Sequence, residues 1–328
     1  VGAGADGGSH DPSVSADGRF VAFESMADNL SINDDDPKKN IYVRDTLLNT
    51  TELVSRADGL LGAGGDDHSL DASISDDGRY VAFWSSADNL SAEADTTAGN
   101  IYVRDRATHT THLVSRASGA AGAVADEPSW TPSISGDGRK VAFRSAATTL
   151  SDHANGTPQI YVRHLDTHVT FLASRGQTHQ PADDHTVEPS ISGDGWRVAF
   201  SSDAGNLTPD DGPGRDVFVR DLAHGTTTLV SRAPGAAAAA GDDASEDPAI
   251  SSDGLHVAFK SKATNLSPVD DAAATDIFAR DVFGAPAPPP PPPDAEPESA
   301  GTPSHGTPEQ RSAHKRRYRC AGRPATIV

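Results

Sequence analysis

Short runs in which apolar and polar residues alternate recur along most of this chain. In one copy such runs cover residues 72–75 and 79–85, and Asp77-Gly78 lies between them. Alternation with a period of two predicts half-buried β-strands. Asp-Gly between two such runs predicts a hairpin with a two-residue type I′ loop, because that turn needs positive φ at both central positions. Further alternating runs predict a third strand at 100–105 and, after a polar link, a fourth at 111–116.

This four-strand unit occurs repeatedly. The glycine of the Asp-Gly pair stands at Gly18, Gly78, Gly138, Gly195 and Gly254, in steps of 60, 60, 57 and 59 residues. Apolar residues recur in the copies at the positions that in the second copy are Ile74, Val81, Phe83, Ile101, Val103 and Leu113, except that the fifth copy has no counterpart of Leu113. A small four-stranded sheet needs neighbours to cover its faces, so the pattern predicts β-propeller blades. The predicted fold class is all-β, a propeller of five four-stranded blades, with six blades as the alternative.

Three regions follow from the repeat and from the composition of its flanks. We predict a propeller over 1–283, a Pro-rich disordered linker over 284–310 and a basic tail over 311–328. The repeats lie near 11–56, 71–116, 131–175, 188–232 and 247–283. The fifth repeat lacks the fourth strand. Because residues 2–10 resemble the loops that follow the fourth strand elsewhere, we expect the missing strand to precede Val1.

Composition narrows the classes of function. The chain has 27 Lys and Arg against 47 Asp and Glu, for a formal net charge of −20. Nucleic-acid binding needs a basic surface, so we expect no nucleic-acid partner. No run of 18 apolar residues occurs, and we expect no membrane insertion. The one cysteine, Cys320, excludes an internal disulfide.

The recurring words Ser-x-Asp-Gly-Arg-x-Val-Ala-Phe-x-Ser and Ile-Tyr-Val-Arg-Asp resemble the repeat of TolB-type, WD-like propellers. This resemblance implies a disc that acts as a non-catalytic binding platform. The chain departs from the family in lacking Pro before the Asp of Asp-Gly and in its longer period. The longer form, with Asn-Leu after the second strand, resembles arrays in secreted actinobacterial proteins, which implies an extracellular or cell-surface location.

Antiparallel order decides which loops share a side of the disc. The second-to-third-strand loops and the links between blades lie on one side, which we call the long-loop face. These loops are long, variable and acidic, so we expect a protein or a glycan to dock there on a monomer. The recurring Arg-Asp at the end of the third strand and the recurring Asn-Leu are interpreted as structural.

Acidic residues in these loops are candidate calcium ligands, because calcium takes 6–8 oxygen ligands. The candidates are Asp34, Asp35, Asp36, Asp210, Asp211, Asp216, Asp270, Asp271 and Asp276. No loop matches EF-hand spacing, and a solvated acidic rim explains the same residues without a metal. No other cofactor is expected.

Two links also carry histidine beside acids, at the start of the innermost strand. These channel-mouth candidates are Asp66, Asp67, His68, Asp183, Asp184 and His185. They leave open a propeller-based enzyme resembling polysaccharide lyases, although the other links lack the histidine. No G-x-S-x-G, H-E-x-x-H or C-x-x-C motif occurs. We therefore expect no enzyme activity. A calcium-stabilised structural spacer is a further alternative to the binding platform.

Overall fold

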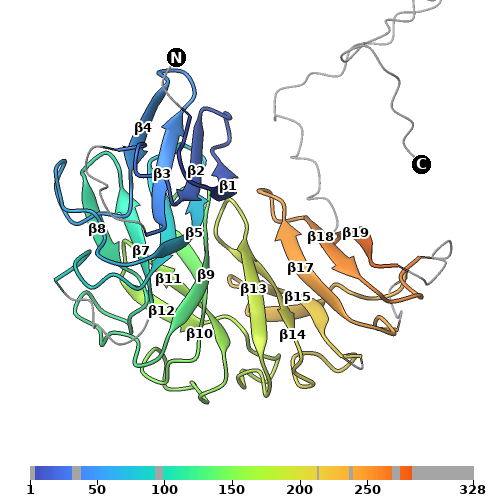
Figure 1. Cartoon of the computed structure of the whole chain (residues 1–328). Helices are drawn as coiled ribbons and strands as arrows, with labels where there is room; N and C mark the ends of the chain where they lie inside the picture. Colours follow the sequence, from blue (N-terminus) through green and yellow to red (C-terminus); the bar gives the residue numbers. More distant parts are fainter. Residues whose placement is uncertain are drawn as a thin grey trace, which may run out of the picture. The chain divides into compact units, whose positions relative to one another are not determined.

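The computed structural model describes residues 4–31, 38–92, 99–212, 214–235, 239–267 and 274–282 of the 328. The chain divides into two units, Val1–Ala285 and Pro286–Val328, and all described residues belong to the first. This part of the chain is all-β (Figure 1).

The strands form five antiparallel sheets, one for each sequence repeat. The first is β1 (Ser9–Val14), β2 (Phe20–Ser25), β3 (Asn40–Asp45) and β4 (Thr50–Leu53); the second is β5 (Ser69–Ile74), β6 (Tyr80–Ser85), β7 (Asn100–Asp105) and β8 (Thr110–Leu113). The third is β9 (Ser129–Ile134), β10 (Lys140–Ser145), β11 (Gln159–His164) and β12 (Val169–Leu172); the fourth is β13 (Thr186–Ile191), β14 (Arg197–Ser202), β15 (Asp216–Asp221) and β16 (Thr226–Leu229). The fifth holds β17 (Ser245–Ile250), β18 (His256–Ser261) and β19 (Asp276–Asp281).

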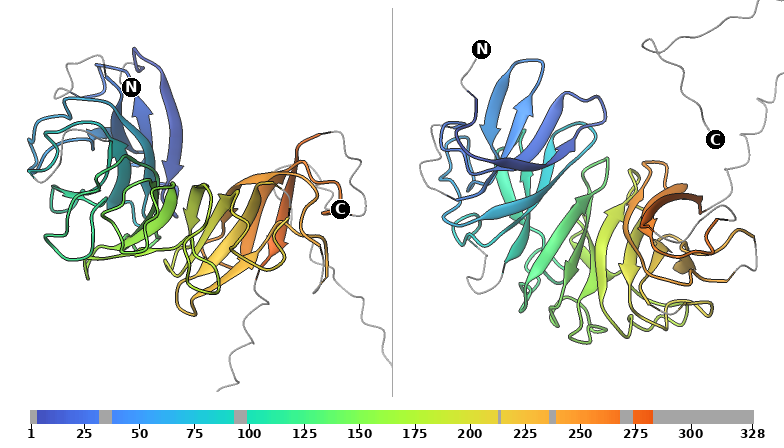
Figure 2. Two further views of the ribbon diagram at one scale, coloured as in Figure 1. Left: turned by 90° about the horizontal axis from the view of Figure 1, so that it is seen from below. Right: turned by 45° about the vertical axis from the view of Figure 1, so that its right-hand side comes forward.

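The predicted propeller of five blades is confirmed. Each sheet has its strands in chain order, and each blade packs against the next, with the first strands of consecutive blades side by side (Figure 2). Four blades have four strands. The fifth has three among the described residues, as the sequence predicted for the copy that lacks the last run.

The prediction of a type I′ turn at Asp-Gly was wrong. Only the glycine has positive φ, 72° at Gly18, and Asp17 keeps a negative φ. The loop is longer than two residues, because β1 ends at Val14 and β2 begins at Phe20. The Asp17 carboxylate accepts hydrogen bonds from the Ser15 hydroxyl at 2.7 Å and the Arg19 N–H at 2.9 Å. These bonds select a four-residue turn that ends in a left-handed glycine, and they explain why Ser-x-Asp-Gly recurs.

Apolar side chains fill the spaces between blades. Tyr102 and Leu113 of the second blade join Ile41 and Val43 of the first in one buried cluster. Equivalent clusters lie between each later pair of blades. Burying apolar surface gives about 25 cal/mol per Å², so stacking between blades is the main source of stability.

Two kinds of hydrogen bond join neighbouring blades as well. The Ser13 hydroxyl accepts the Ile74 N–H of the next blade at 3.2 Å, and the same bond recurs at the three later junctions. Arg104 has no solvent exposure and reaches back to the preceding link, donating to the Ala57 and Gly59 carbonyls at 3.0 and 2.9 Å. Arg163, Arg220 and Arg280 reach back in the same way.

The arginine of Arg-Asp thus bonds to the link of the preceding blade, and the aspartate forms hydrogen bonds within its own blade. Asp45 accepts the N–H groups of Leu47 and Leu48, which starts the turn expected after the third strand. It also pairs with Arg19 of the Asp-Gly-Arg turn, with Nη2 and Oδ2 2.7 Å apart. The recurrence of both motifs is therefore explained by contacts inside the fold.

We predict that Arg104→Ala lowers the free energy of unfolding by about 3–5 kcal/mol. The change removes several charged hydrogen bonds and leaves buried carbonyls without a donor. Urea unfolding measures the loss. Arg44→Ala is the matched control, because Arg44 bonds only to Thr51 and Asn49 of its own blade, and it should cost under about 1 kcal/mol. Equal losses of unfolding free energy in the two variants would contradict a role of Arg104 in joining neighbouring blades.

The Arg19–Asp45 pair predicts a dependence of stability on acid pH. Hydrogen bonds from Arg19, and then from the Leu48 and Leu47 N–H groups, lower the pKa of Asp45 to about 2. The unfolded chain has a pKa near 3.9 at such a residue, so the stabilisation is complete above about pH 4 and is lost as the pH falls toward 2. Asp45→Asn should therefore lower the melting temperature at pH 6 and have little effect at pH 2. A gap between the two proteins that does not close on acidification would contradict this assignment.

Candidate functional site

The long-loop face consists of the links between blades, residues 57–68, 117–128, 176–185 and 233–244, and the loops between the second and third strands. Residues 32–37, 93–98, 213 and 268–273 of these loops and residues 236–238 of the last link lie outside the described residues. The link before the second blade is tied to the loop that follows that blade's second strand. Asn89 Oδ1 accepts the Asp66 N–H at 3.2 Å, and its Nδ2 donates to the Gly64 carbonyl at 2.8 Å. Leu90 beside it is buried, so the predicted structural role of Asn-Leu is confirmed there.

The first acid of each link has a structural role as well. Asp66 accepts the Asp88 N–H at 3.1 Å, and Asp183 accepts the Gly205 N–H at 3.0 Å. Asp126 and Asp242 accept both the N–H and the hydroxyl of a threonine. These carboxylates are therefore used to hold the loops together.

The second acid of each link is more available to a partner. Asp184 and Asp243 each cap the N–H of the residue that follows them, at 2.7 Å, and both are exposed. Glu127 at the same position is exposed, and Asp67 is half-buried. The long-loop face thus carries an acid at the same place in four successive links, and three of these four acids are exposed.

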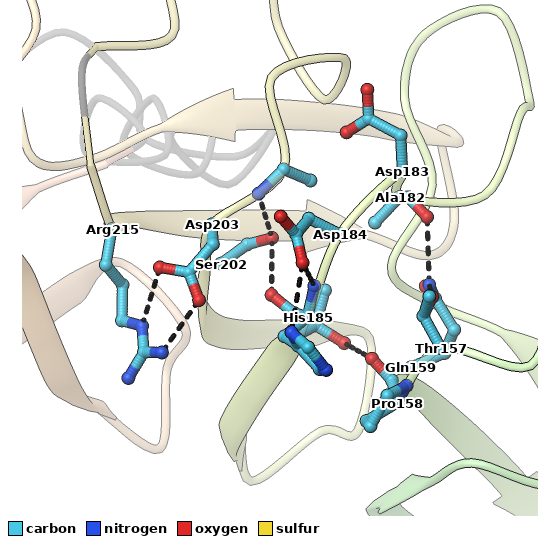
Figure 3. Close-up of polar contacts among 12 residues, drawn as sticks. Thr157, Pro158, Gln159, Ala182, Asp183, Asp184, His185, Ser202, Asp203 and Arg215 are labelled. Carbon is cyan, nitrogen blue, oxygen red and sulfur yellow. Dashed lines mark hydrogen bonds and ion pairs between the residues drawn. The ribbon is translucent and has the colours of Figure 1, made fainter.

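Figure 3 shows this arrangement around His185. The Asp184 carboxylate contacts His185 Nδ1 at 3.0 Å, whereas the Asp183 carboxylate points away toward another loop. The His185 carbonyl accepts from the Ser202 hydroxyl at 3.1 Å. Arg215 pairs with Asp203, with Nη2 and Oδ2 2.7 Å apart. The site is a hydrogen-bonded corner in which Asp183, Asp184 and His185 are exposed and Gln159 and Ser202 are buried.

The channel-mouth candidates are not brought together as a ligand set. Asp66, Asp67 and His68 lead into the second blade, and Asp183, Asp184 and His185 lead into the fourth, with the third blade between them. His68 Nδ1 accepts the Lys39 N–H at 3.0 Å, so that nitrogen is used within the fold. Among the described residues, no group of three or more His, Cys, Asp or Glu side chains is placed to hold a metal.

The calcium candidates divide into two groups. Asp34, Asp35, Asp36, Asp270 and Asp271 lie outside the described residues. Asp211 accepts the Leu207 and Thr208 N–H groups at 3.1 Å, and burial raises its pKa. Asp216 is buried, accepts the Ser231 hydroxyl at 2.7 Å and has a pKa that burial raises. These two carboxylates serve internal bonds, while Asp276 is exposed at the start of β19 and Asp210 is exposed in its loop.

Sequence reasoning missed a second set of acids. The third residue of the first strand of every blade has positive φ, and four of these five residues are acidic: Asp11, Asp71, Thr131, Glu188 and Asp247. The strand pairing shifts at this point, as in a β-bulge. Glu188 accepts the Asp247 N–H of the next blade at 2.7 Å, and burial raises the pKa of Glu188. The signal in sequence was the acid or threonine that stands two residues before Ser-Ile.

Solved propeller structures are similar to this chain in fold. The β-propeller domain of the Trilobed protease from Pyrococcus furiosus matches 84% of this chain and 69% of its own, with 12% identity and a TM-score of 0.50. The chain has the β-propeller fold. The resemblance to TolB-type propellers is confirmed at the level of the fold.

Two TolB structures are also similar to this chain. A putative TolB from Agrobacterium tumefaciens matches 84% of this chain and 77% of its own, with 16% identity and a TM-score of 0.47. TolB from Acinetobacter baumannii has 16% identity and a TM-score of 0.46; the match covers 79% of this chain and 53% of that one, so the chain spans about half its length. Propeller-containing peptidases are similar as well. No protein-family model and no curated protein matches, and the described residues include no helix long and apolar enough to cross a membrane.

The Asp66–Asp88 contact on the long-loop face predicts a stabilising substitution. A hydrogen bond and charge repulsion from Asp66 raise the pKa of Asp88, so its ionised form is disfavoured in the folded protein. Asp88→Asn should therefore raise the melting temperature at pH 7, and the gain should shrink as the pH falls and Asp88 takes up a proton.

The third blade offers the reverse change as a control. Thr148 occupies the equivalent place beside Asp126, so Thr148→Asp should lower the melting temperature at pH 7. A neutral or destabilising Asp88→Asn would show that the two carboxyl groups do not repel each other.

Proposed function

We propose that this protein is a non-catalytic, extracellular binding propeller that docks a protein or a glycan on its long-loop face. The observation that carries the proposal is the series of acids at one place in four successive links, of which Glu127, Asp184 and Asp243 are exposed and Asp67 is half-buried. They lie on one face of a rigid stack of blades, which is the arrangement expected of a docking surface that is positioned by a scaffold.

The recurring polar residues and the second acids of the links differ in their hydrogen bonding, and this difference supports the proposed function. Residues that recur in every blade, such as the Ser-x-Asp-Gly turn and the Arg-Asp pair, form bonds within or between blades. The acids at the second link position cap one local N–H and leave their remaining oxygens toward solvent. Exposed acids of one sign steer a partner with complementary charge. The favoured partner is therefore a protein with a basic surface, or a glycan that carries basic groups.

Charge-neutral variants test this surface. Asp184→Asn combined with Asp243→Asn removes two protruding charges while keeping the caps, because asparagine also accepts the N–H. Asp76→Asn combined with Asp166→Asn is the matched control, since both residues are exposed on the opposite face. We expect the first double variant to capture at least about tenfold less partner from a cell-surface extract than the wild type or the control.

Capture should also weaken as salt is raised, because exposed charges are screened. The capture experiment is run once with calcium and once with a chelator. A difference between the two runs reports on the candidate calcium ligands of the long-loop face. Equal capture by both double variants would contradict docking on the long-loop face.

A further inference from the structure

One position in the second strand of each blade departs from the repeat. The word Ala-Phe-x-Ser is the same in all five copies, but x is Glu24, Trp84, Arg144, Ser201 and Lys260. None of these five residues is exposed, so free variation on a solvent-covered surface does not explain the differences. The residue opposite x in the first strand differs among the blades as well, as Trp130 opposite Arg144 illustrates. Residues that hold the fold together recur, so these positions are left for another use.

The varying positions of the third, fourth and fifth blades lie along one line. Their first strands, β9, β13 and β17, lie side by side (Figure 1). We call these strands and the second-strand residues opposite them the inner rim. Glu188 of β13 accepts the Asp247 N–H of β17 at 2.7 Å and the Ser201 hydroxyl at 3.0 Å, so polar contacts along the inner rim cross from blade to blade.

The cations at the fourth and fifth blades already have acidic partners. Lys260 pairs with Asp247, and its Nζ lies 3.4 Å from a carboxylate oxygen of Glu246. Arg215 pairs with Asp203 and lies 3.7 Å from the second carboxylate oxygen of Glu246. These two cations are therefore neutralised within the protein.

Arg144 differs from them because it has no acidic partner among the described residues. Its guanidinium stacks on the Trp130 ring, with Cζ 5.1 Å from the ring centroid. Burial, and then repulsion from Arg215, lowers the pKa of Arg144, and attraction to Glu188 opposes both. A guanidinium held on a ring without a carboxylate is a preformed donor for an anion.

Two buried atoms at the same corner also lack a partner within the described chain. They are Arg144 Nε and Thr131 Oγ1, and Thr131 follows Trp130 in β9. Buried polar atoms are nearly always bonded, so the protein alone does not balance the polar groups of this corner. Arg144 Nη1 and Nη2 are not enclosed in this way, and they are the atoms that a ligand can reach.

The charges of the inner rim favour a ligand with a single negative charge. The inner rim and its ion pairs hold three cations and four acids: Arg144, Arg215 and Lys260 against Glu188, Asp203, Glu246 and Asp247. A dianion such as phosphate would be repelled by this excess of acid, whereas one carboxylate matches the one guanidinium that lacks a partner.

The uncharged groups of the corner favour a sugar over a peptide. Trp130 and Glu188 are half-buried, so a ring face and a carboxyl group are available to the apolar face and the hydroxyls of a sugar. A peptide main chain would need backbone N–H donors on the first strands, but the Asp247 N–H at the bulge is already bonded to Glu188.

We propose that Trp130 and Arg144 of the third blade, with Glu188 of the fourth, form a binding site for a carboxylate-bearing sugar unit of a glycan. Arg144 donates hydrogen bonds from Nη1 and Nη2 to the carboxylate, the Trp130 ring packs against the sugar, and Glu188 bonds to its hydroxyls. The site uses none of the second acids of the links, so it does not rest on the function proposed above.

Isothermal titration of the full chain with an oligomer of four glucuronate units tests the proposal. We expect saturable binding, and at least about tenfold weaker binding of the matching oligomer of four glucose units, which lacks carboxylates. The acidic oligomer should also change the tryptophan fluorescence. Trp130→Phe should abolish this change, whereas Trp196→Phe should keep it, because Trp196 lies in the Asp-Gly turn on the opposite face.

An arginine variant checks the carboxylate contact. Arg144→Gln should weaken binding of the acidic oligomer at least about tenfold and leave that of the neutral oligomer unchanged. Arg139→Gln is the control, because Arg139 is an exposed arginine that pairs with Asp166 on the opposite face. Thermal melting shows that each variant is folded. Arg144→Lys serves if Arg144→Gln does not fold: it keeps the charge but loses the planar fork, and should bind about threefold more weakly or worse.

Four outcomes would overturn the proposal. These are no binding of the acidic oligomer at millimolar concentration, equal binding of the neutral oligomer, and unchanged binding by the Arg144 variants. The fourth is equally tight binding of inorganic phosphate or of a peptide of four glutamates, which would show a general anion site instead of a sugar site.

Discussion

Apolar residues on both faces of each small sheet need a neighbouring sheet to cover them, and the rest of the structure depends on this packing between blades. Ile41 and Tyr102 are fully buried because consecutive blades meet there. Where a blade has no described neighbour on one side, equivalent side chains are exposed: Val14 of the first blade is 59% exposed and Ile277 of the fifth is 76% exposed. Burial in this protein is thus a property of pairs of blades rather than of a single blade.

The same constraint explains where polar groups are used. Once the blades stack, the carbonyls of each link are enclosed, and a buried carbonyl without a donor costs about 1–3 kcal/mol. Arg104 and its counterparts supply the donors from the following blade. Recurring arginines, aspartates and serines are therefore committed to internal bonds. The residues left for a partner are the second acids of the links.

Much of this was predictable from sequence. The strand period, the five copies and the missing last strand of the fifth copy all follow from local patterns, and the structure has them in the same places. The long-loop face follows from strand order alone. By contrast, the Asp-Gly turn was predicted with the wrong geometry, because the hydrogen bond that the Ser15 hydroxyl donates to the Asp17 carboxylate outweighs the general preference of the dipeptide. The bulge at Asp71 and its counterparts was missed, because one extra residue in a six-residue strand hardly alters the alternation, although an acid or a threonine recurs at this position.

The sequence by itself determined the repeat, the strands and which residues form the core, because these depend on spacing along the chain. Only the tertiary structure decided which acids accept hydrogen bonds from another loop and which bond only to a neighbouring residue. Asp183 and Asp184 are identical neighbours in sequence, yet one accepts a loop N–H and the other is left outward. Chain-local patterns specify elements, whereas contacts between blades specify which surfaces stay open.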